Sequence, residues 1–418
     1  MRVLIVNTNE KTGGAAVAAG RLMAALINNG VKAKMLVQRK ETESITVVGL
    51  KRYSLWERLL IFAHLHFSRE HLFEIDIARC GKDITSLREF KEADIIHLHW
   101  VNQGMLSTAN VRKILDSGKP VVWTMHDAWP ATAICHYTRG CERFKTRCCN
   151  CPLLPGGGSR HDLASRVWSR KQRVLAGRLI HFVACSNWLA GEAKKSALLT
   201  GQSITAIPNP IDTRVFCAMD KAEAQLASGL PADKRIILFV SQKVTDKRKG
   251  MDYLVEAVRM LVESHPEMKD DTGIAILGGH SEELAGQLAL PVYPLGYVNE
   301  EHKIVSAYNA ADLFVTPSVE DNLPNTIMEA MACGVPCVGF RVGGIPEMID
   351  NGKNGYVAAL GDAADLARGM HWVLCEADRK GLADAAQRKV AMSYSQHGVA
   401  LKYIEVYNQA LAFRRYKI

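Results

Sequence analysis

The chain has 418 residues, 48% of them hydrophobic and 23% charged, so it is too long for one ordinary domain and long enough for two hydrophobic cores. Its formal charge of +9 suits an anionic partner such as a diphosphate, an acidic membrane surface or nucleic acid. No apolar run reaches the roughly 20 residues that span a bilayer, and the opening MRVLIVNTNE has a buried-strand pattern rather than that of a signal peptide. We therefore expect a cytoplasmic protein of two domains.

The first half of the chain alternates short apolar strands with helical patterns. A strand at residues 2–7 is followed by a loop containing Gly13 and Gly14, a helix that ends near residue 28, and a strand at 33–37. Further strands are expected at 93–99, 120–125 and 181–185. This order predicts a mostly parallel sheet.

The same order begins again after a polar stretch at 212–233. Strands are expected at 235–241, 273–279, 292–298, 312–317 and 336–340. Because parallel crossovers are right-handed, both halves should be doubly wound sheets with helices on both faces. We expect Rossmann-like domains at 1–212 and 213–395, facing a central cleft, and a final helix at 396–418 that packs back on the first domain. Ligands of such sheets lie at the carboxyl ends of the strands, where the strand order reverses.

The segment PSVEDNLPNTIMEAMACGVP at 317–336 carries the most information. It predicts a strand ending at Thr316, a polar loop with two acids, and a helix over about 324–334. The first helical N–H groups, at Asn325 and Thr326, suit a diphosphate, and the Glu329 carboxylate could accept two ribose hydroxyls. The residues alone equally allow acids that only favour a helix N-terminal region and keep it soluble.

This segment resembles the signature of the large retaining glycosyltransferase family 4, the glycosyl transferases group 1, which has the GT-B fold. In that family two acids eight positions apart bracket the donor sugar and the ribose, and Glu-Ala-Met-Ala-Cys-Gly-x-Pro follows. The resemblance implies that Asp321 and Glu329 are the catalytic pair, with Glu320 beside the first acid. It also implies donor contacts from four neighbours: Asn322, Leu323, Asn325 and Thr326.

A basic loop at 241–250 is similar to the family segment in which an arginine and a lysine clamp the diphosphate. Lys249 matches the lysine, whereas Lys243 or Arg248 would supply the second charge. Cations there would neutralise the departing diphosphate and so stabilise the transition state. Without the resemblance, a Lys-Arg-Lys run is typical of a solvated loop.

Other family elements follow in order. Gly279 corresponds to the strand-ending glycines, and Tyr297 and Val298 to the segment whose backbone holds the nucleobase, so the donor would be a UDP-sugar or a GDP-sugar. Gly13 and Gly14 match the family's glycine loop under the donor phosphates and the acceptor.

Histidines gather at the carboxyl ends of two expected strands. His97 and His99 point to one side of their strand by its period of two. The resemblance places His126 against the transferred sugar, although histidines at such positions are more often structural.

The resemblance implies a retaining, metal-independent transfer of a hexosyl-type sugar from a nucleotide diphosphate sugar to a glycan or lipid-linked acceptor. No Asp-x-Asp occurs, and cations and helix N-termini can hold a diphosphate without a catalytic metal. A same-face mechanism would follow, in which a leaving phosphate oxygen takes the acceptor proton. A similar subgroup suggests bacterial surface polysaccharide biosynthesis, of capsule or lipopolysaccharide. Two alternatives are a nonhydrolysing nucleotide-sugar epimerase and a basic nucleic-acid-binding protein with a zinc knuckle, but interleaved basic and aromatic repeats are lacking and we expect no nucleic acid partner.

Five of the eleven cysteines crowd into 135–151. Four of them have a spacing that could hold a structural zinc: Cys135, Cys141, Cys148 and Cys151. A disulfide knuckle and free thiols are the alternatives.

A stretch at 51–73 mixes large apolar residues with lysines and arginines. Helices of this composition can lie in a membrane interface, which would suit a lipid-linked acceptor and a peripheral contact with the inner face of the cytoplasmic membrane. A helix packed into the core is the favoured interpretation.

Overall fold

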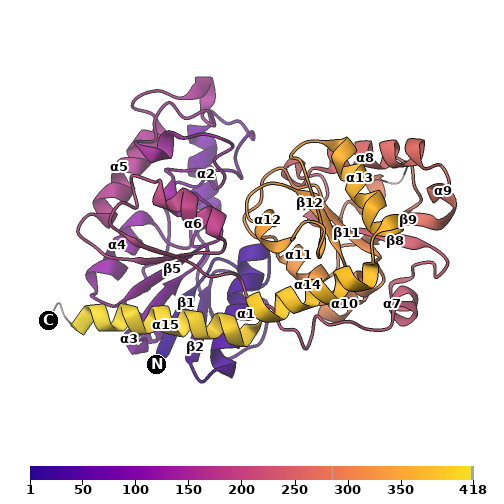
Figure 1. Ribbon diagram of the computed structural model, residues 1–418. Helices are drawn as coiled ribbons and strands as arrows, with labels where there is room; N and C mark the ends of the chain where they lie inside the picture. Colours follow the sequence, from indigo (N-terminus) through magenta and orange to yellow (C-terminus); the bar gives the residue numbers. More distant parts are fainter. Residues whose placement is uncertain (285, 416–418) are drawn as a thin grey trace. The chain divides into compact units, whose positions relative to one another are not determined.

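The computed structural model describes residues 1–284 and 286–415, and the chain forms two compact units (Figure 1). Unit 1 comprises Met1–Pro210 and Val399–Ile418, and unit 2 comprises Ile211–Gly398. The end of the expected first domain, at residue 212, lies close to this boundary. Residues 416–418 of the expected final helix lie outside the described residues.

Unit 1 is built on a seven-stranded sheet in which every strand pair is parallel, in the order β3-β2-β1-β4-β5-β6-β7. The strands are β1 (Arg2–Val6), β2 (Lys32–Val37), β3 (Val47–Gly49), β4 (Ile95–Leu98), β5 (Val121–Met125), β6 (His181–Ala184) and β7 (Ser203–Ala206). The helices are α1 (Gly14–Asn28), α2 (Ser54–His64), α3 (Arg88–Glu92), α4 (Thr108–Asp116), α5 (Leu163–Leu175), α6 (Asn187–Lys194) and α15 (Gln396–Arg415), with short turns η1 (Trp129–Ala131), η2 (Arg143–Lys145) and η3 (Pro155–Gly157).

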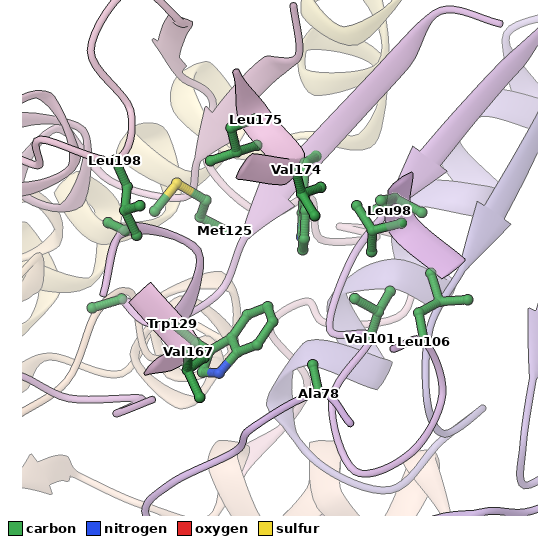
Figure 2. Packing of buried hydrophobic residues seen from close by; sticks show 14 of the residues in the cluster. Ala78, Leu98, Val101, Leu106, Met125, Trp129, Val167, Val174, Leu175 and Leu198 are labelled. Atoms are coloured by element: carbon green, nitrogen blue, oxygen red, sulfur yellow. The ribbon is translucent and has the colours of Figure 1, made fainter. Parts of the chain in front are cut away.

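The two faces of this sheet carry separate hydrophobic cores. Successive side chains of a strand point to opposite faces, and β1 accordingly sends Val3 and Ile5 into one core and Leu4 and Val6 into the other. Figure 2 shows part of the second core, where Trp129 packs among aliphatic side chains from several elements. The first core includes apolar residues of α1 and α15.

Helix α15 is tied to the strands of unit 1 by buried tyrosines. The Tyr407 hydroxyl lies 2.7 Å from His97 Nδ1, and the Tyr403 hydroxyl lies 2.9 Å from Thr124 Oγ1. Both tyrosines are at most 2% exposed. This segment from the end of the chain is therefore part of the fold of unit 1.

Unit 2 contains a second parallel sheet, of six strands in the order β10-β9-β8-β11-β12-β13. The strands are β8 (Arg235–Lys243), β9 (Thr272–Gly279), β10 (Val292–Gly296), β11 (Leu313–Thr316), β12 (Cys337–Phe340) and β13 (Gly355–Ala358). The helices are α7 (Lys221–Ser228), α8 (Met251–Ser264), α9 (Met268–Asp271), α10 (Glu301–Asn309), α11 (Asn325–Ala332), α12 (Ile345–Met348), α13 (Ala363–His371) and α14 (Arg379–Ser393), with turns η4 (Lys247–Lys249), η5 (Ser281–Leu284) and η6 (Trp372–Glu376).

Each sheet has one point at which the strand order reverses. In unit 1 the chain moves outward from β1 through β2 and β3 and then returns to place β4 on the other side of β1. In unit 2 it moves from β8 through β9 and β10 and returns to place β11 beside β8. The expected pair of doubly wound, Rossmann-like sheets is confirmed, and the loops after β1, β4, β8 and β11 are the positions where such sheets bind ligands.

Helix α2 differs from the expectation of a helix packed into the core. Its buried residues are Glu57 and Ile61, whereas Leu55, Trp56 and Leu59 are exposed. Across the described part of the chain, no helix has the length and apolar character needed to cross a membrane.

Candidate functional site

The reversal point of unit 2 is formed by two loops that pack closely on each other. The turn η4 follows β8 and ends at Gly250, whose φ of 72° is left-handed. A Cβ at Gly250 would lie 1.8 Å from the Pro317 carbonyl oxygen in the loop after β11. Val319 N donates to the Arg248 carbonyl oxygen across the same contact, at 3.0 Å. Glycine is therefore required for the two loops to approach.

An ion pair joins these loops at the reversal point. Lys249 Nζ lies 2.6 Å from Asp321 Oδ2, and Arg248 Nη1 lies 3.7 Å from the same oxygen. Asp321 is 9% exposed. Burial alone would raise the pKa of the Asp321 carboxyl, but Lys249 and Arg248, helped by the Asn322 N–H, hold that pKa below its usual value. Asp321 is therefore an anion that faces two cations.

Helix α11 begins directly after the second loop. Pro324 precedes its first residue, no side chain caps the helix start, and its first turn carries no acid. The predicted strand–loop–helix order of this segment is confirmed by β11 and α11. A helix start of this kind attracts an anion through its N–H groups and its dipole.

Glu329 is held in the interior of α11. It is 8% exposed, and the Tyr308 hydroxyl donates to its Oε2 at 2.8 Å. Tyr308 lies on α10 and was not predicted as a site residue, because a buried tyrosine in a helical pattern carries no signal of its partner. This hydrogen bond fixes one oxygen of the carboxylate.

The remaining predicted residues of the second loop are also packed into this region. Asn322 and Leu323 are buried, and the Asn322 carbonyl oxygen accepts from Gly344 N at 2.7 Å. A Cβ at Gly343, where φ is 54°, would lie 1.7 Å from the Asp321 carbonyl oxygen. The paired glycines let the loop after β12 close on the backbone that carries Asp321. Three predicted donor contacts, Glu320, Asn325 and Thr326, are partly buried.

Lys243 and Arg248 are the two expected sources of the second charge beside Lys249. Arg248 lies near the Asp321 carboxylate, whereas the Lys243 side chain is exposed and its backbone pairs with Gly279 in the β8–β9 ladder. Tyr297 and Val298 follow β10, at the edge of the sheet, and Tyr297 is exposed.

The reversal point of unit 1 begins with a glycine turn. Gly13 has a φ of 96° and precedes α1, whose first residue is Gly14. A Cβ at Gly13 would meet no atom within 4 Å. The backbone here is therefore open to a neighbouring group, and its left-handed φ favours glycine.

Three histidines meet at the carboxyl ends of β4 and β5: His97 lies in β4, and His99 and His126 follow β4 and β5. His126 Nε2 lies 2.9 Å from His99 Nδ1, and His126 Nδ1 lies 3.5 Å from Cys185 Sγ. The rings of His97 and His99 are 4.2 Å apart, as their common side of the strand predicts. Burial lowers the pKa of His126 to about 4 and that of His97 to about 3, so these imidazoles are neutral at pH 7.

A second buried pair lies next to this cluster. Asp127 Oδ2 is 2.7 Å from His136 Nδ1 and accepts from Trp100 Nε1 at 2.8 Å. Burial alone would raise the pKa of Asp127, but His136 and the hydrogen bonds lower it. The His-Asp sequence at 126–127 gave no indication that His136 would be the partner.

All eleven cysteines are free thiols. Within residues 1–284 and 286–415, no three or more His, Cys, Asp or Glu side chains are arranged to hold a metal ion. The zinc arrangement allowed by Cys135, Cys141, Cys148 and Cys151 is therefore not formed. Burial raises the pKa of the Cys135 and Cys148 thiols to about 12, so both are protonated at pH 7.

Two Rossmann-like units, the second with cations and a helix start at its reversal point, define a protein of the nucleotide-binding α/β class. Comparisons with known proteins give the family. A model described as Glycosyltransferase Family 4 matches residues 12–215, and one described as Glycosyl transferases group 1 matches residues 234–376. The two models together span most of the chain, which belongs to this family of glycosyltransferases with the GT-B fold.

Known proteins of this family resemble the chain along its length. D-inositol 3-phosphate glycosyltransferase of Thermobispora bispora is 27% identical over 330 residues, which cover 76% of this chain and 71% of that protein. Other relatives match over about half of their length. Among solved structures, sucrose-phosphate synthase of Thermosynechococcus elongatus has a TM-score of 0.69 at 18% identity, covering 99% of both chains. HepE of Anabaena in complex with UDP-glucose has a TM-score of 0.64 at 17% identity, covering 98% of this chain and 100% of that one. These structures have the same fold.

Proposed function

We propose that this glycosyltransferase moves a hexosyl-type sugar, with retention at the anomeric carbon, from a UDP-sugar or GDP-sugar to a glycan or lipid-linked acceptor. The observation that carries the donor assignment is the Lys249–Asp321 ion pair, which joins the loops after β8 and β11 beside the start of α11. Sheets of this kind bind nucleotides where the strand order reverses.

Lys249 and Arg248 are the proposed partners of the donor diphosphate. Both side chains are partly exposed, at 23% and 22%, and Arg248 also pairs with Asp246 at 3.1 Å, so a diphosphate would share these two cations with the two carboxylates. The N-terminus of α11 adds N–H groups at Asn325 and Thr326. Charge that develops on the leaving diphosphate would be stabilised by these groups, so we propose that no catalytic metal is needed.

Glu329 is the proposed ligand of the ribose. The Tyr308 hydroxyl occupies Oε2 and holds the carboxylate in one orientation, which suits the acceptance of hydroxyl hydrogen bonds. Asp321 is proposed to lie at the donor sugar, with Glu320 beside it, and to hold Lys249 in place. The backbone near Tyr297 and Val298, with Gly279, is the proposed position of the base, as the family order implies.

In unit 1, His126 is proposed to contact the transferred sugar as a neutral hydrogen-bonding group. Its lowered pKa makes it a poor cation, and its contact with His99 fixes the ring. The Gly13–Gly14 turn is proposed to lie under the phosphates and the acceptor. In the proposed reaction no protein side chain acts as the nucleophile. An oxygen of the leaving phosphate takes the proton of the acceptor hydroxyl.

Surface polysaccharide biosynthesis, of bacterial capsule or lipopolysaccharide, is the proposed setting, with the enzyme in the cytoplasm and peripheral at the inner face of the membrane. The glycosyltransferase relatives support a nucleotide-sugar donor and a hydroxyl acceptor.

Sugar transfer can be tested with a panel of UDP-sugars and GDP-sugars, glycan and lipid-linked acceptors, and excess chelator. The product is isolated and its anomeric configuration read by NMR. The proposal expects one donor to give a product that keeps the donor's anomeric configuration despite the chelator. An inverted product, or transfer only after a divalent ion is restored, contradicts the retaining and metal-independent parts respectively.

A further inference from the structure

Several apolar side chains of helix α2 in unit 1 are exposed to solvent. Leu55, Trp56 and Leu59 are 67%, 63% and 48% exposed and follow one another on one side of the helix. Phe67 and Phe73, in the segment after the helix, are more than 70% exposed. Contiguous exposed apolar side chains of this size are typical of an interaction surface.

The outward orientation of α2 is fixed by a buried carboxylate. Glu57, on the opposite side of the helix, is fully buried and accepts from Cys80 N at 2.7 Å and Arg79 N at 3.0 Å. Burial, followed by the charge of Asp76, raises the pKa of Glu57. Rotating the apolar side inward would break these hydrogen bonds and expose a carboxyl that the fold has buried. The exposed apolar side is therefore a built feature of unit 1.

A basic cavity of about 550 Å³ lies beside the helix, lined by Leu60 and His64 of α2 and by residues of α5. Three arginines of α5, spaced four and three residues apart, fall on one side of that helix. The arginines of the cavity are Arg79, Arg147, Arg166, Arg170 and Arg173.

These five arginines form no ion pair within the described residues, although the charge of Glu57 acts on Arg170 and opposes the lowering of its pKa by burial. Arg147 bonds to serine hydroxyls and Arg170 to the Ile77 carbonyl oxygen. Arg170 Nε is buried without a partner in the same residues. Five guanidinium groups around one cavity favour an anion with several oxygens, and phosphate matches their fork geometry.

We propose that the exposed side of α2 and the arginine cavity form one docking surface for an anionic phospholipid membrane. Lipid phosphates would enter the cavity, and Leu55, Trp56 and Leu59 would enter the boundary between headgroups and acyl chains. A phospholipid carries an anionic phosphate and apolar acyl chains in one molecule. It therefore fits a basic cavity that lies beside exposed apolar side chains of α2. This inference deepens the proposed peripheral location and does not rest on the donor site in unit 2.

Vesicle sedimentation tests the surface in the whole protein. Vesicles of phosphatidylcholine with phosphatidylglycerol are compared with phosphatidylcholine alone, using Arg166→Gln/Arg173→Gln and Trp56→Ser/Leu59→Ser. All four positions are exposed, so the variants should fold. Two lost charges near an anionic surface should weaken binding roughly tenfold or more, and the apolar variant should weaken it comparably. Matched controls are Arg112→Gln on α4 and Leu401→Ser on α15, which should bind as the wild type does.

Four outcomes overturn the proposal: no binding to anionic vesicles, equal binding to neutral ones, wild-type binding by either double variant, or loss of binding in a control. The wild type and the Arg166→Gln/Arg173→Gln variant are also incubated with glycerol phosphate. If that soluble ester stabilises the wild type through Arg166 and Arg173 while vesicles do not bind, the cavity takes a soluble anion instead. Nucleotide binding, measured on the same variants, separates a failure of this surface from a failure of the proposed donor site.

Discussion

Replacing Lys249 by methionine should destabilise unit 2 by leaving Asp321 with a weaker partner. Breaking a buried ion pair from one side costs about 3–5 kcal/mol when the other charge is left uncompensated. Arg248 remains 3.7 Å from Asp321 Oδ2, and Lys249 is itself 23% exposed. Both facts reduce the effect, and we expect the free energy of unfolding of unit 2 to fall by about 2 kcal/mol at pH 7.

A double-mutant cycle isolates this ion pair. Asp321→Asn added to Lys249→Met removes the charge that had lost its partner, so the double variant should be more stable than the sum of the single effects by about 1–2 kcal/mol. The pKa of Asp321 is lowered in the fold, so this coupling is present above pH about 4 and is lost as the pH falls through the lowered value.

Hydrogen exchange of β8 and α11 is the suitable assay, because a chain of two units need not unfold in one step and exchange reports local opening free energies. Lys243→Met is the matched control, since Lys243 is exposed and lies on the same strand-loop segment. It should change stability by no more than about 0.5 kcal/mol. Additive single effects in the cycle, or an equal loss in the control, would refute the role given to the pair.

Three further predictions concern Tyr308 and Gly250 of unit 2 and His126 of unit 1. Tyr308→Phe removes the hydroxyl bound to Glu329 and should weaken nucleotide binding roughly tenfold, because a lost hydrogen bond to a charged group costs about 1.5–3 kcal/mol. Titration calorimetry measures the nucleotide affinity, and an unchanged affinity would contradict the role of Tyr308 in orienting Glu329. Gly250→Ala places a Cβ 1.8 Å from a carbonyl oxygen and should abolish nucleotide binding, with faster hydrogen exchange in η4; wild-type binding would show that the loops need not meet as described. The pKa of His126 is lowered to about 4, so as the pH falls the unfolded chain binds a proton at this residue before the folded protein does, and unit 1 should lose stability between pH about 6.5 and about 4. In acid unfolding curves His126→Gln should make this loss of stability smaller. An unchanged curve would count against a neutral buried histidine.

Most of the fold could be predicted because continuous apolar strands stand between helical patterns. The strands that prediction missed are short: β3 has three residues, and β7 has no buried residue by its burial pattern. Such edge strands lack the continuous apolar run that identifies a strand buried on both faces. β13, with four residues, was also not predicted.

The orientation of α2 could not be predicted from its composition. A count of apolar residues favoured a helix packed into the core, but the hydrogen bonds from the backbone at 79–80 to Glu57 decide which side is buried. A buried carboxylate in a mixed pattern looks like an ordinary solvated residue until its donors, distant in the chain, are known.

The order of the candidate site residues along the chain could be predicted, whereas their contacts with one another could not. Asp321, Glu329 and Lys249 come from one strand-loop-helix motif and one basic loop, which sequence patterns can locate. The pairing of Arg248 rather than Lys243 with Asp321 depends on the turn at Gly250, and the Tyr308–Glu329 bond depends on how α10 packs against α11. Such contacts arise from tertiary packing and leave no local signal.

The central claim is that the reversal point of unit 2 binds a nucleotide diphosphate without a metal. Titration calorimetry of UDP and GDP with excess chelator, on the wild type, Lys249→Met, Glu329→Gln and the Lys243→Met control, tests it most directly. The account predicts that one nucleotide binds the wild type and the control, and that affinity falls at least roughly tenfold in the other two variants, as expected when a charged hydrogen bond is lost. Binding of neither nucleotide, or undiminished binding in both site variants, would contradict it.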